Sequence, residues 1–134
     1  MKKAFAASLF YLIFGLAFGV FYREFTRMMD YNGDTALSFT HSHMLGLGFA
    51  FFLIVVILEK VFDICSRKYY KTFFWTYNAG LLITLFALIY RGILDVLSSD
   101  LSFLPYIAGT GHIIITIGFG FFMKTIADVI RKKQ

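Results

Sequence analysis

Residues 36–58 read ALSFTHSHMLGLGFAFFLIVVIL, and this stretch decides the fold. Its only ionisable side chains are His41 and His43, which lie near its start. A helix needs about 20 consecutive apolar residues to cross the hydrocarbon core of a bilayer. The stretch therefore predicts a transmembrane helix that carries two histidines in its first turns.

Three similar runs account for most of the remaining chain, so we expect four spans at about residues 4–22, 36–58, 72–97 and 101–123. Of the 134 residues, 59% are hydrophobic and only 16% are charged, which is more apolar surface than a soluble domain of this size can bury. Long runs without period-2 alternation argue against a β-barrel. The sequence predicts an all-α fold, with residues 1–134 forming a single four-transmembrane-helix bundle.

The first span could be mistaken for a signal peptide, because Lys2 and Lys3 precede it. It lacks a small-x-small cleavage site and is long for the apolar region of a signal, so we expect a retained helix. Pro105 falls in the first turn of the fourth span, where a missing N–H does no harm.

Basic residues predict the orientation of the bundle. With a cytoplasmic N-terminus, ten basic residues face the cytoplasm and three face outward, so the positive-inside rule places both termini in the cytoplasm. The basic ends then meet anionic lipid, and no nucleic-acid site is expected. The lone Cys65 implies no disulfide within the chain. The ten are Lys2, Lys3, Lys60, Arg67, Lys68, Lys71, Lys124, Arg131, Lys132 and Lys133, and the three are Arg23, Arg27 and Arg91.

The three histidines of the chain fall at a common depth. At about 1.5 Å per residue, His41 and His43 lie roughly 9 and 12 Å into their helix, and His112 lies about 12 Å into the fourth. The same outer layer receives Arg91, Asp95, Arg23 and Glu24. Ionisable side chains inside a membrane indicate function by default. Two structural alternatives stay open: the histidines could bond to neighbouring helices, and Arg91 and Asp95, four residues apart, could neutralise each other.

Spacing bears on which cofactor this layer would take. Residues at i,i+2 point about 200° apart on a helix, so His41 and His43 cannot grip one metal ion from one face. Small residues flank His43 and His112, among them Gly46 and Gly109, and would allow a flat macrocycle to approach the backbone, although small residues also serve tight helix packing. Haem held by histidines of two facing helices is a known solution in helical bundles, with an arginine such as Arg91 neutralising the propionates.

Three segments carry a resemblance to known proteins: residues 22–26 (YREFT), 40–48 (THSHMLGLG) and 108–112 (AGTGH). They resemble an uncharacterised family of bacterial four-span membrane proteins with an HxH motif in the second span, which implies a bacterial cytoplasmic membrane and no particular activity. The His41 stretch is also similar to the second helix of haem-copper oxidase and nitric-oxide-reductase catalytic subunits. That similarity implies His41 as an axial haem ligand, with His112 opposite. The chain has too few helices and no further histidine cluster for oxidase chemistry.

Together these features predict a membrane protein that binds haem b near its outer face, for electron transfer, haem handling or gas sensing. The cofactor-binding residues are then drawn from His41, His43, His112 and Arg91. A transition-metal site for copper or zinc, with Glu24 or Asp95 as additional ligands, is the first alternative, and a structural or interaction protein without cofactor is the second. Either His41 or His43 is left without an obvious use inside one bundle. We therefore also expect a homodimer, with the spare histidine or the cofactor near the interface. No catalytic residue is assigned, and whether the chain is an enzyme is left open.

Overall fold

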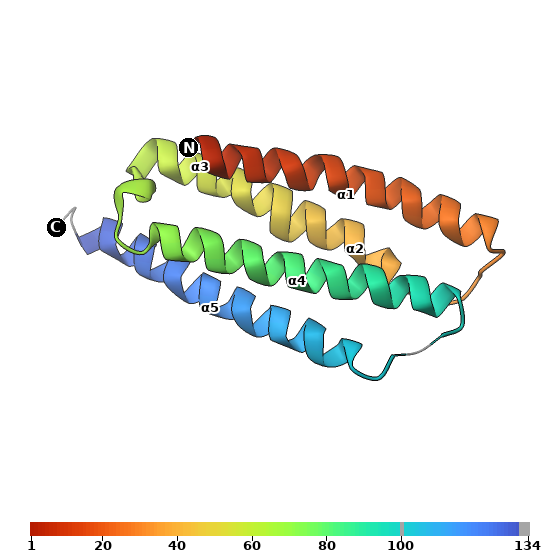
Figure 1. Ribbon diagram of the computed structural model, residues 1–134. Helices are drawn as coiled ribbons and strands as arrows, with labels where there is room; N and C mark the ends of the chain where they lie inside the picture. The colour runs from red at the N-terminus through yellow and green to blue at the C-terminus, as the bar shows by residue number, and fades with distance from the viewer. Residues whose placement is uncertain (100, 132–134) are drawn as a thin grey trace.

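The structure is a computed structural model that describes residues 1–99 and 101–131. Two members of the predicted cytoplasmic basic set, Lys132 and Lys133, lie outside the described residues, as do Asp100 and Gln134. Four long helices run side by side and both termini lie at one end (Figure 1). They are α1 (Lys2–Met28), the second span (Leu37–Phe62), α4 (Tyr70–Val96) and α5 (Leu104–Arg131).

The second span is not a uniform α-helix. It begins as α2 (Leu37–His43), continues as the π-helix η1 (Met44–Ala50) and ends as α3 (Phe51–Phe62). A short 3₁₀-helix, η2 (Ile64–Ser66), connects it to α4. In η1 the backbone hydrogen bonds reach one residue further, as in the bond from the N–H of Phe51 to the carbonyl of Gly46. Such π segments occur often at functional sites, since they change the direction in which the preceding side chains point.

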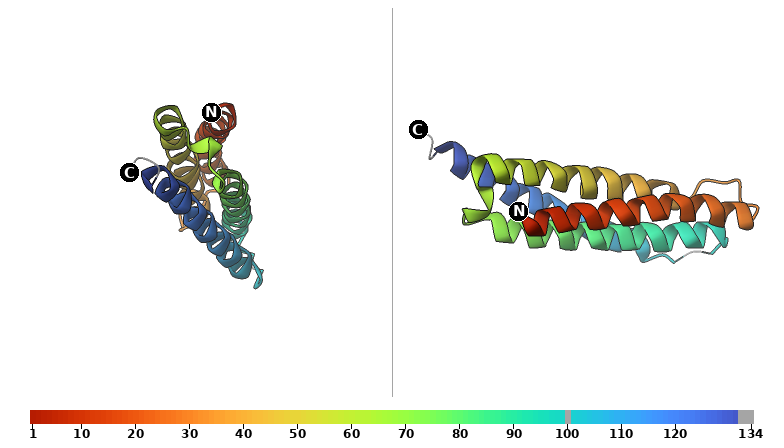
Figure 2. Two further views of the ribbon diagram at one scale, coloured as in Figure 1. Left: turned by 90° about the vertical axis from the view of Figure 1, so that its left-hand side faces the viewer. Right: turned by 90° about the horizontal axis from the view of Figure 1, so that it is seen from above.

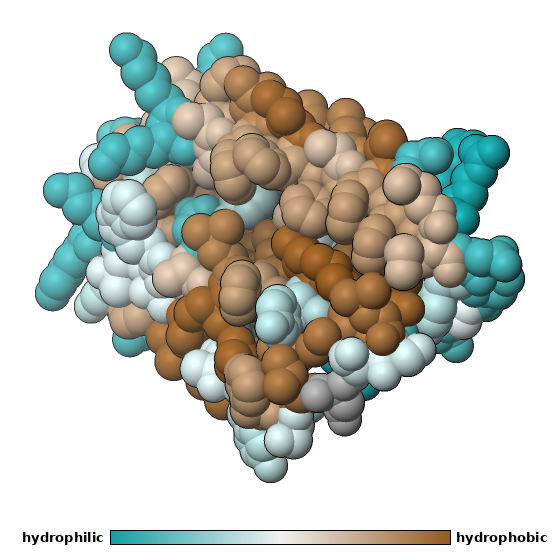
Figure 3. All heavy atoms as spheres, turned by 45° about the vertical axis from the view of Figure 1, so that its right-hand side comes forward, coloured by the Kyte–Doolittle hydropathy of each residue, from teal (hydrophilic) through white to brown (hydrophobic). Residues whose placement is uncertain are grey.

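All four helices are long and apolar enough to cross a membrane, which confirms the predicted all-helical four-span class. Each covers its predicted span except for at most three residues at one end, and α5 continues beyond residue 123 to Arg131. Pro105 is the second residue of α5, in its first turn as expected. Hydrophobic side chains cover the middle of the molecule and hydrophilic ones gather at its two ends (Figure 3).

Small residues allow the helices to approach closely. A Cβ on Gly80 of α4 would lie 2.6 Å from the backbone nitrogen of Ile115, and one on Gly118 of α5 would lie 2.9 Å from the Cα of Tyr77. Gly48 of η1 lies directly against the ring of Tyr11 in α1. Helices in membranes associate largely through such close packing, because the surrounding lipid is as apolar as the helix faces.

The helices are arranged so that α1 packs on the second span, while α4 packs on both α2 and α5. We call the end with the termini the termini end, and the opposite end, with the 29–36 and 97–103 connections, the far end. The helix α5 runs obliquely to the others, so its far-end half lies beside α4 and away from α2 (Figure 2). Nearer the termini end, α5 meets the second span through the ring of Phe51.

Candidate functional site

The side chain of His43 is fixed by its own helix. Its Nδ1 lies 2.8 Å from the carbonyl oxygen of Phe39, four residues earlier. A carbonyl only accepts hydrogen bonds, so Nδ1 carries the hydrogen in this contact. In the neutral imidazole the lone pair is then on Nε2, which is the atom that binds a metal when Nδ1–H is held by a backbone carbonyl.

His112 on α5 repeats this arrangement. Its Nδ1 lies 2.8 Å from the carbonyl oxygen of Ala108, again four residues earlier, and its side chain is exposed. The same tautomer follows, with an Nε2 lone pair that points away from the helix backbone. The two histidines therefore share the same tautomer and the same hydrogen bond to their own helix, on two different helices.

These two histidines lie on sides of their helices that converge on the same group of rings. Phe51 of the second span has its ring centroid 5.3 Å from that of Phe119 on α5. His112 precedes Phe119 by seven residues, which is two turns along the same side of α5. On the second span, Leu47 lies between His43 and Phe51, and its carbonyl accepts a 2.9 Å hydrogen bond from the hydroxyl of Tyr77 in α4.

The π-helix determines this placement of His43. In a regular α-helix, residues eight apart lie about 80° from each other around the axis, so His43 would turn away from Phe51. The wider turns of η1 take up one residue more, and His43, Leu47 and Phe51 follow one another along one side. His43 therefore points toward the side of the second span that faces α4 and α5.

His43 and His112 also lie at nearly the same depth. The second span and α5 run in the same direction, from the far end to the termini end. From the level where Phe51 meets Phe119, His43 is eight residues and His112 seven residues toward the far end, or roughly 10–12 Å in each case at 1.5 Å per residue.

Arg91 of α4 lies between the two helices that carry His43 and His112. It is about one turn nearer the far end than these histidines. It lines a cavity of about 490 Å³ together with Phe39 of α2. It also lines a smaller cavity of about 140 Å³ together with Ala108 of α5. Phe39 and Ala108 are the residues whose carbonyls hold His43 and His112. Neither cavity is lined by a histidine, and the carboxylates of Asp34 and Asp95 line the larger one together with Arg91.

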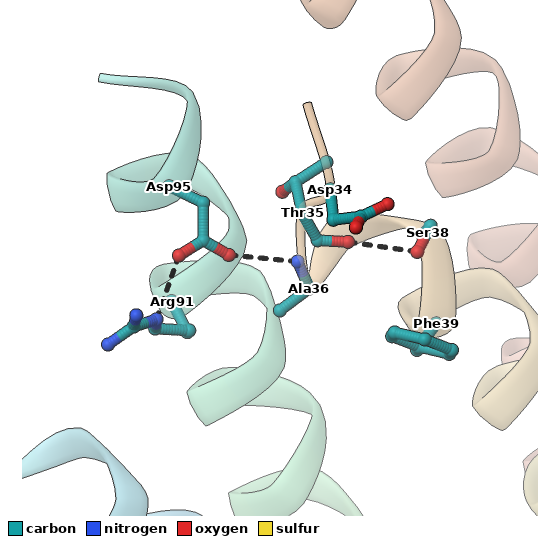
Figure 4. A pocket seen from close by; sticks show the side chains of 7 residues that line it. All are labelled: Asp34, Thr35, Ala36, Ser38, Phe39, Arg91 and Asp95. Carbon is teal, nitrogen blue, oxygen red and sulfur yellow. Dashed lines mark hydrogen bonds and ion pairs between the residues drawn. The ribbon is translucent and has the colours of Figure 1, made fainter. Parts of the chain in front are cut away.

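The charge of Arg91 is paired. Its Nε donates to Oδ1 of Asp95 at 2.8 Å, and Oδ2 of Asp95 accepts the backbone N–H of Ala36 at 2.9 Å (Figure 4). A neighbouring hydrogen bond of 2.7 Å runs from the Thr35 hydroxyl to the carbonyl of Gly92. The predicted i,i+4 pair thus forms, and it attaches the start of the second span to α4.

His41 lies on the other side of its helix, against α1. Its ring atoms come within 3.8 Å of the position that a Cβ on Gly19 would occupy. Its Nδ1 is buried, and within the described part of the chain no hydrogen-bond partner reaches it. The sequence prediction that His41 and His43 point in opposite directions agrees with these contacts.

The remaining predicted residues, at the far end of α1, pair with one another. Arg23 and Arg27 are exposed near the end of α1 and lie 3.7 and 4.0 Å from the carboxylate of Glu24. Among residues 1–99 and 101–131, no group of three or more His, Cys, Asp or Glu side chains is close enough to hold a metal ion.

Sequence reasoning did not identify two parts of this arrangement. The π-helix has no sequence signature beyond Gly46 and Gly48, and glycines also suit ordinary helix packing. The partners Phe39 and Ala108 act through backbone carbonyls, so their side chains carry no signal, although a histidine in a helix always has a carbonyl four residues earlier.

The fold and these side chains define a four-span helical membrane protein. In one half of its bundle, two histidines each have Nδ1 held by a backbone carbonyl. Residues 1–129 match the family described as "Protein of unknown function (DUF2871)", and the chain belongs to this family. Comparison with curated proteins and comparison with solved structures each found no match. The family description assigns no activity.

Proposed function

We propose that this protein binds haem b between the second span and α5, with His43 and His112 as the two axial ligands, and serves in electron transfer, haem handling or gas sensing. The observation that carries the proposal is the identical fixing of the two imidazoles. In each, a backbone carbonyl 2.8 Å from Nδ1 leaves Nε2 available for iron. When bound, haem would supply a redox-active iron, whose potential depends on its axial ligands and surroundings.

The residues around the histidines fit such a group. A Cβ on Gly109, one turn before His112, would meet nothing within 4 Å, and the same is true of Gly46 beyond His43. Both positions are therefore open, and a planar macrocycle could approach the backbone there. Arg91, half-exposed beside Phe39 and Ala108, is the cation closest in position to receive propionates.

The oxidase resemblance favours His41 as the axial ligand, but the structure makes His43 the better candidate for this proposal. His41 contacts α1, on the side of the second span away from α5. An iron shared with His112 requires a histidine on the side that faces α4 and α5, and His43 meets that requirement. His41, with its buried Nδ1, is left to another partner.

Two further parts of the proposal concern the assembly. Eight basic residues of the described chain belong to the termini end and three to the far end, which supports cytoplasmic termini and a haem near the outer face. We also propose a homodimer, because a single haem site uses only one of His41 and His43. Mass measurement in mild detergent tests the dimer, and a monomer with its full complement of cofactor would contradict it.

An absorption spectrum of protein purified from haem-sufficient cells, combined with metal analysis, tests the function. We expect a red protein with a Soret band and one iron per site. Copper or zinc without a Soret band would favour the transition-metal alternative. A colourless protein free of metal, after reconstitution with haem has also failed, would leave the structural or interaction role.

A further inference from the structure

A second polar pocket lies at the termini end, far from the histidines. It has a volume of about 540 Å³ and is lined by Ser66 of η2, Arg67 and Lys68 of the following connection, and Asp128 and Arg131 of α5. Three cations face one carboxylate, so the pocket has a net positive charge. Such basic pockets between membrane helices suit the head groups of anionic lipids.

Arg67 is the residue that points to a ligand. Its Nε is buried, and no acceptor reaches it within the described part of the chain. The backbone of Arg67 is held in place by a 3.1 Å hydrogen bond from its N–H to the carbonyl of Ile64. Among the described residues no ion pair joins Arg67 to Asp128. A buried guanidinium N–H without an acceptor is costly, and a phosphate oxygen would satisfy it.

A separate apolar groove lies on the same side of α5, nearer the middle of the helix. It has a volume of about 250 Å³ and is lined by Ile117, Gly120, Phe121 and Lys124. These residues share one side of α5 with Asp128 and Arg131, because Lys124, Asp128 and Arg131 are spaced four and seven residues apart. A Cβ on Gly120 would meet nothing within 4 Å, so the groove is open there.

Lys124 lines the groove at its end nearer the pocket, one turn before Asp128. Its Nζ is 5.5 Å from the ring centroid of Tyr69 and 6.0 Å from that of Phe121. The two rings are stacked with centroids 6.2 Å apart, and they form a wall that joins the start of α4 to α5. The apolar groove and the cationic pocket therefore follow one another along one side of α5, in the order of the acyl chain and head group of a lipid.

We propose that this surface is a specific site for a phospholipid with a net negative head group, such as phosphatidylglycerol. The phosphate accepts hydrogen bonds from Arg67 and Arg131, Lys68 adds to the positive field, and one acyl chain lies over Gly120. A glycerol head group also carries hydroxyls that can donate to the Asp128 carboxylate. A free phosphate would use the pocket but leave the groove without a role.

The site can be tested by counting retained lipids in native mass spectra of the intact protein, released from micelles that contain phosphatidylglycerol, phosphatidylethanolamine or phosphatidylcholine. We expect phosphatidylglycerol to be retained in preference to the two zwitterionic lipids. Each removed charge should weaken binding about fivefold, so the double variant Arg67→Gln/Arg131→Gln should bind about 25-fold more weakly. The matched control Lys2→Gln/Lys60→Gln removes the same charge at the same end, from exposed positions outside the pocket, and should retain the lipid.

Two further experiments distinguish a bound lipid from other ligands. Gly120→Leu fills an open position, so it should not lower the melting temperature but should lower lipid retention severalfold. Inorganic phosphate at millimolar concentration should compete only weakly. Equal retention of the three lipids, equal loss in the control and the pocket variant, full retention in Gly120→Leu, or displacement by phosphate alone would each overturn the proposal. Haem content does not enter these readouts, so the result is independent of the proposed function.

Discussion

His43 and His112 make the same hydrogen bond on two different helices, each from Nδ1 to the carbonyl four residues earlier at 2.8 Å. A histidine in a helix can make this bond without any further role, so neither contact alone implies a ligand. The pair is informative because both imidazoles lie at one depth, on sides that converge on the contact between Phe51 and Phe119. Two neutral imidazoles with available Nε2 atoms are what a six-coordinate haem requires of a protein.

The first prediction concerns the axial ligands. His112→Ala and His43→Ala should each remove one ligand and convert a low-spin haem spectrum to a high-spin or haem-free one, because a coordination position is left vacant. His41→Ala is the matched control, since it removes a histidine two residues from His43 on the opposite side of the helix. Absorption spectra of the three variants make the comparison. An unchanged low-spin spectrum in His112→Ala would show that the ligand assignment is wrong.

A second prediction concerns the close approach of α4 and α5. Gly80→Ala places a methyl group against the backbone of Ile115 and should destabilise the bundle by about 1–3 kcal/mol, the usual cost of overpacking. Gly120→Ala adds the same methyl group to α5 at an open position and should be neutral or stabilising by about 0.5–1 kcal/mol, because alanine is the better helix former. Thermal unfolding in one detergent compares them, and equal melting temperatures would contradict this account of the packing.

The four spans could be predicted from the sequence because apolar runs of this length have few alternatives in water or in a bilayer. The common depth of the histidines followed from counting residues along straight helices. Which side each histidine faces could not be predicted, because it depends on the π-helix at Met44–Ala50 and on the oblique path of α5. Both result from packing between helices, such as that of Gly48 on Tyr11 and Gly111 on Thr84, and leave no period in the sequence.

The pair of Arg91 and Asp95 illustrates the same limit. Their i,i+4 spacing allowed mutual neutralisation to be predicted, and the 2.8 Å ion pair bears this out. The hydrogen bond from the N–H of Ala36 to Asp95 joins residues 59 apart in the chain, and no local pattern anticipates it.

A third prediction addresses the orientation of the bundle. Reporter fusions at Asp30 and Asp100 should read external, and fusions at Arg67 and Gln134 should read cytoplasmic, because the basic residues concentrate at the termini end. The opposite pattern would move the histidines to the inner half of the membrane. It would leave the ligand assignment intact and change the compartment with which a haem exchanges electrons or ligands.

The last prediction separates the two roles that Arg91 can have. If Arg91 does not contact the haem, then Arg91→Leu and Asp95→Asn should affect haem retention equally. If its guanidinium also contacts the propionates, Arg91→Leu should weaken haem retention by roughly 1.5–3 kcal/mol beyond Asp95→Asn, which is the usual worth of a hydrogen bond to a charged group. The Soret position should stay the same in both variants, because neither residue ligates iron. Rates of haem transfer to apomyoglobin, measured beside the melting temperature of each variant, distinguish these cases. Equal transfer rates in the two variants would assign Arg91 to the structural pair alone.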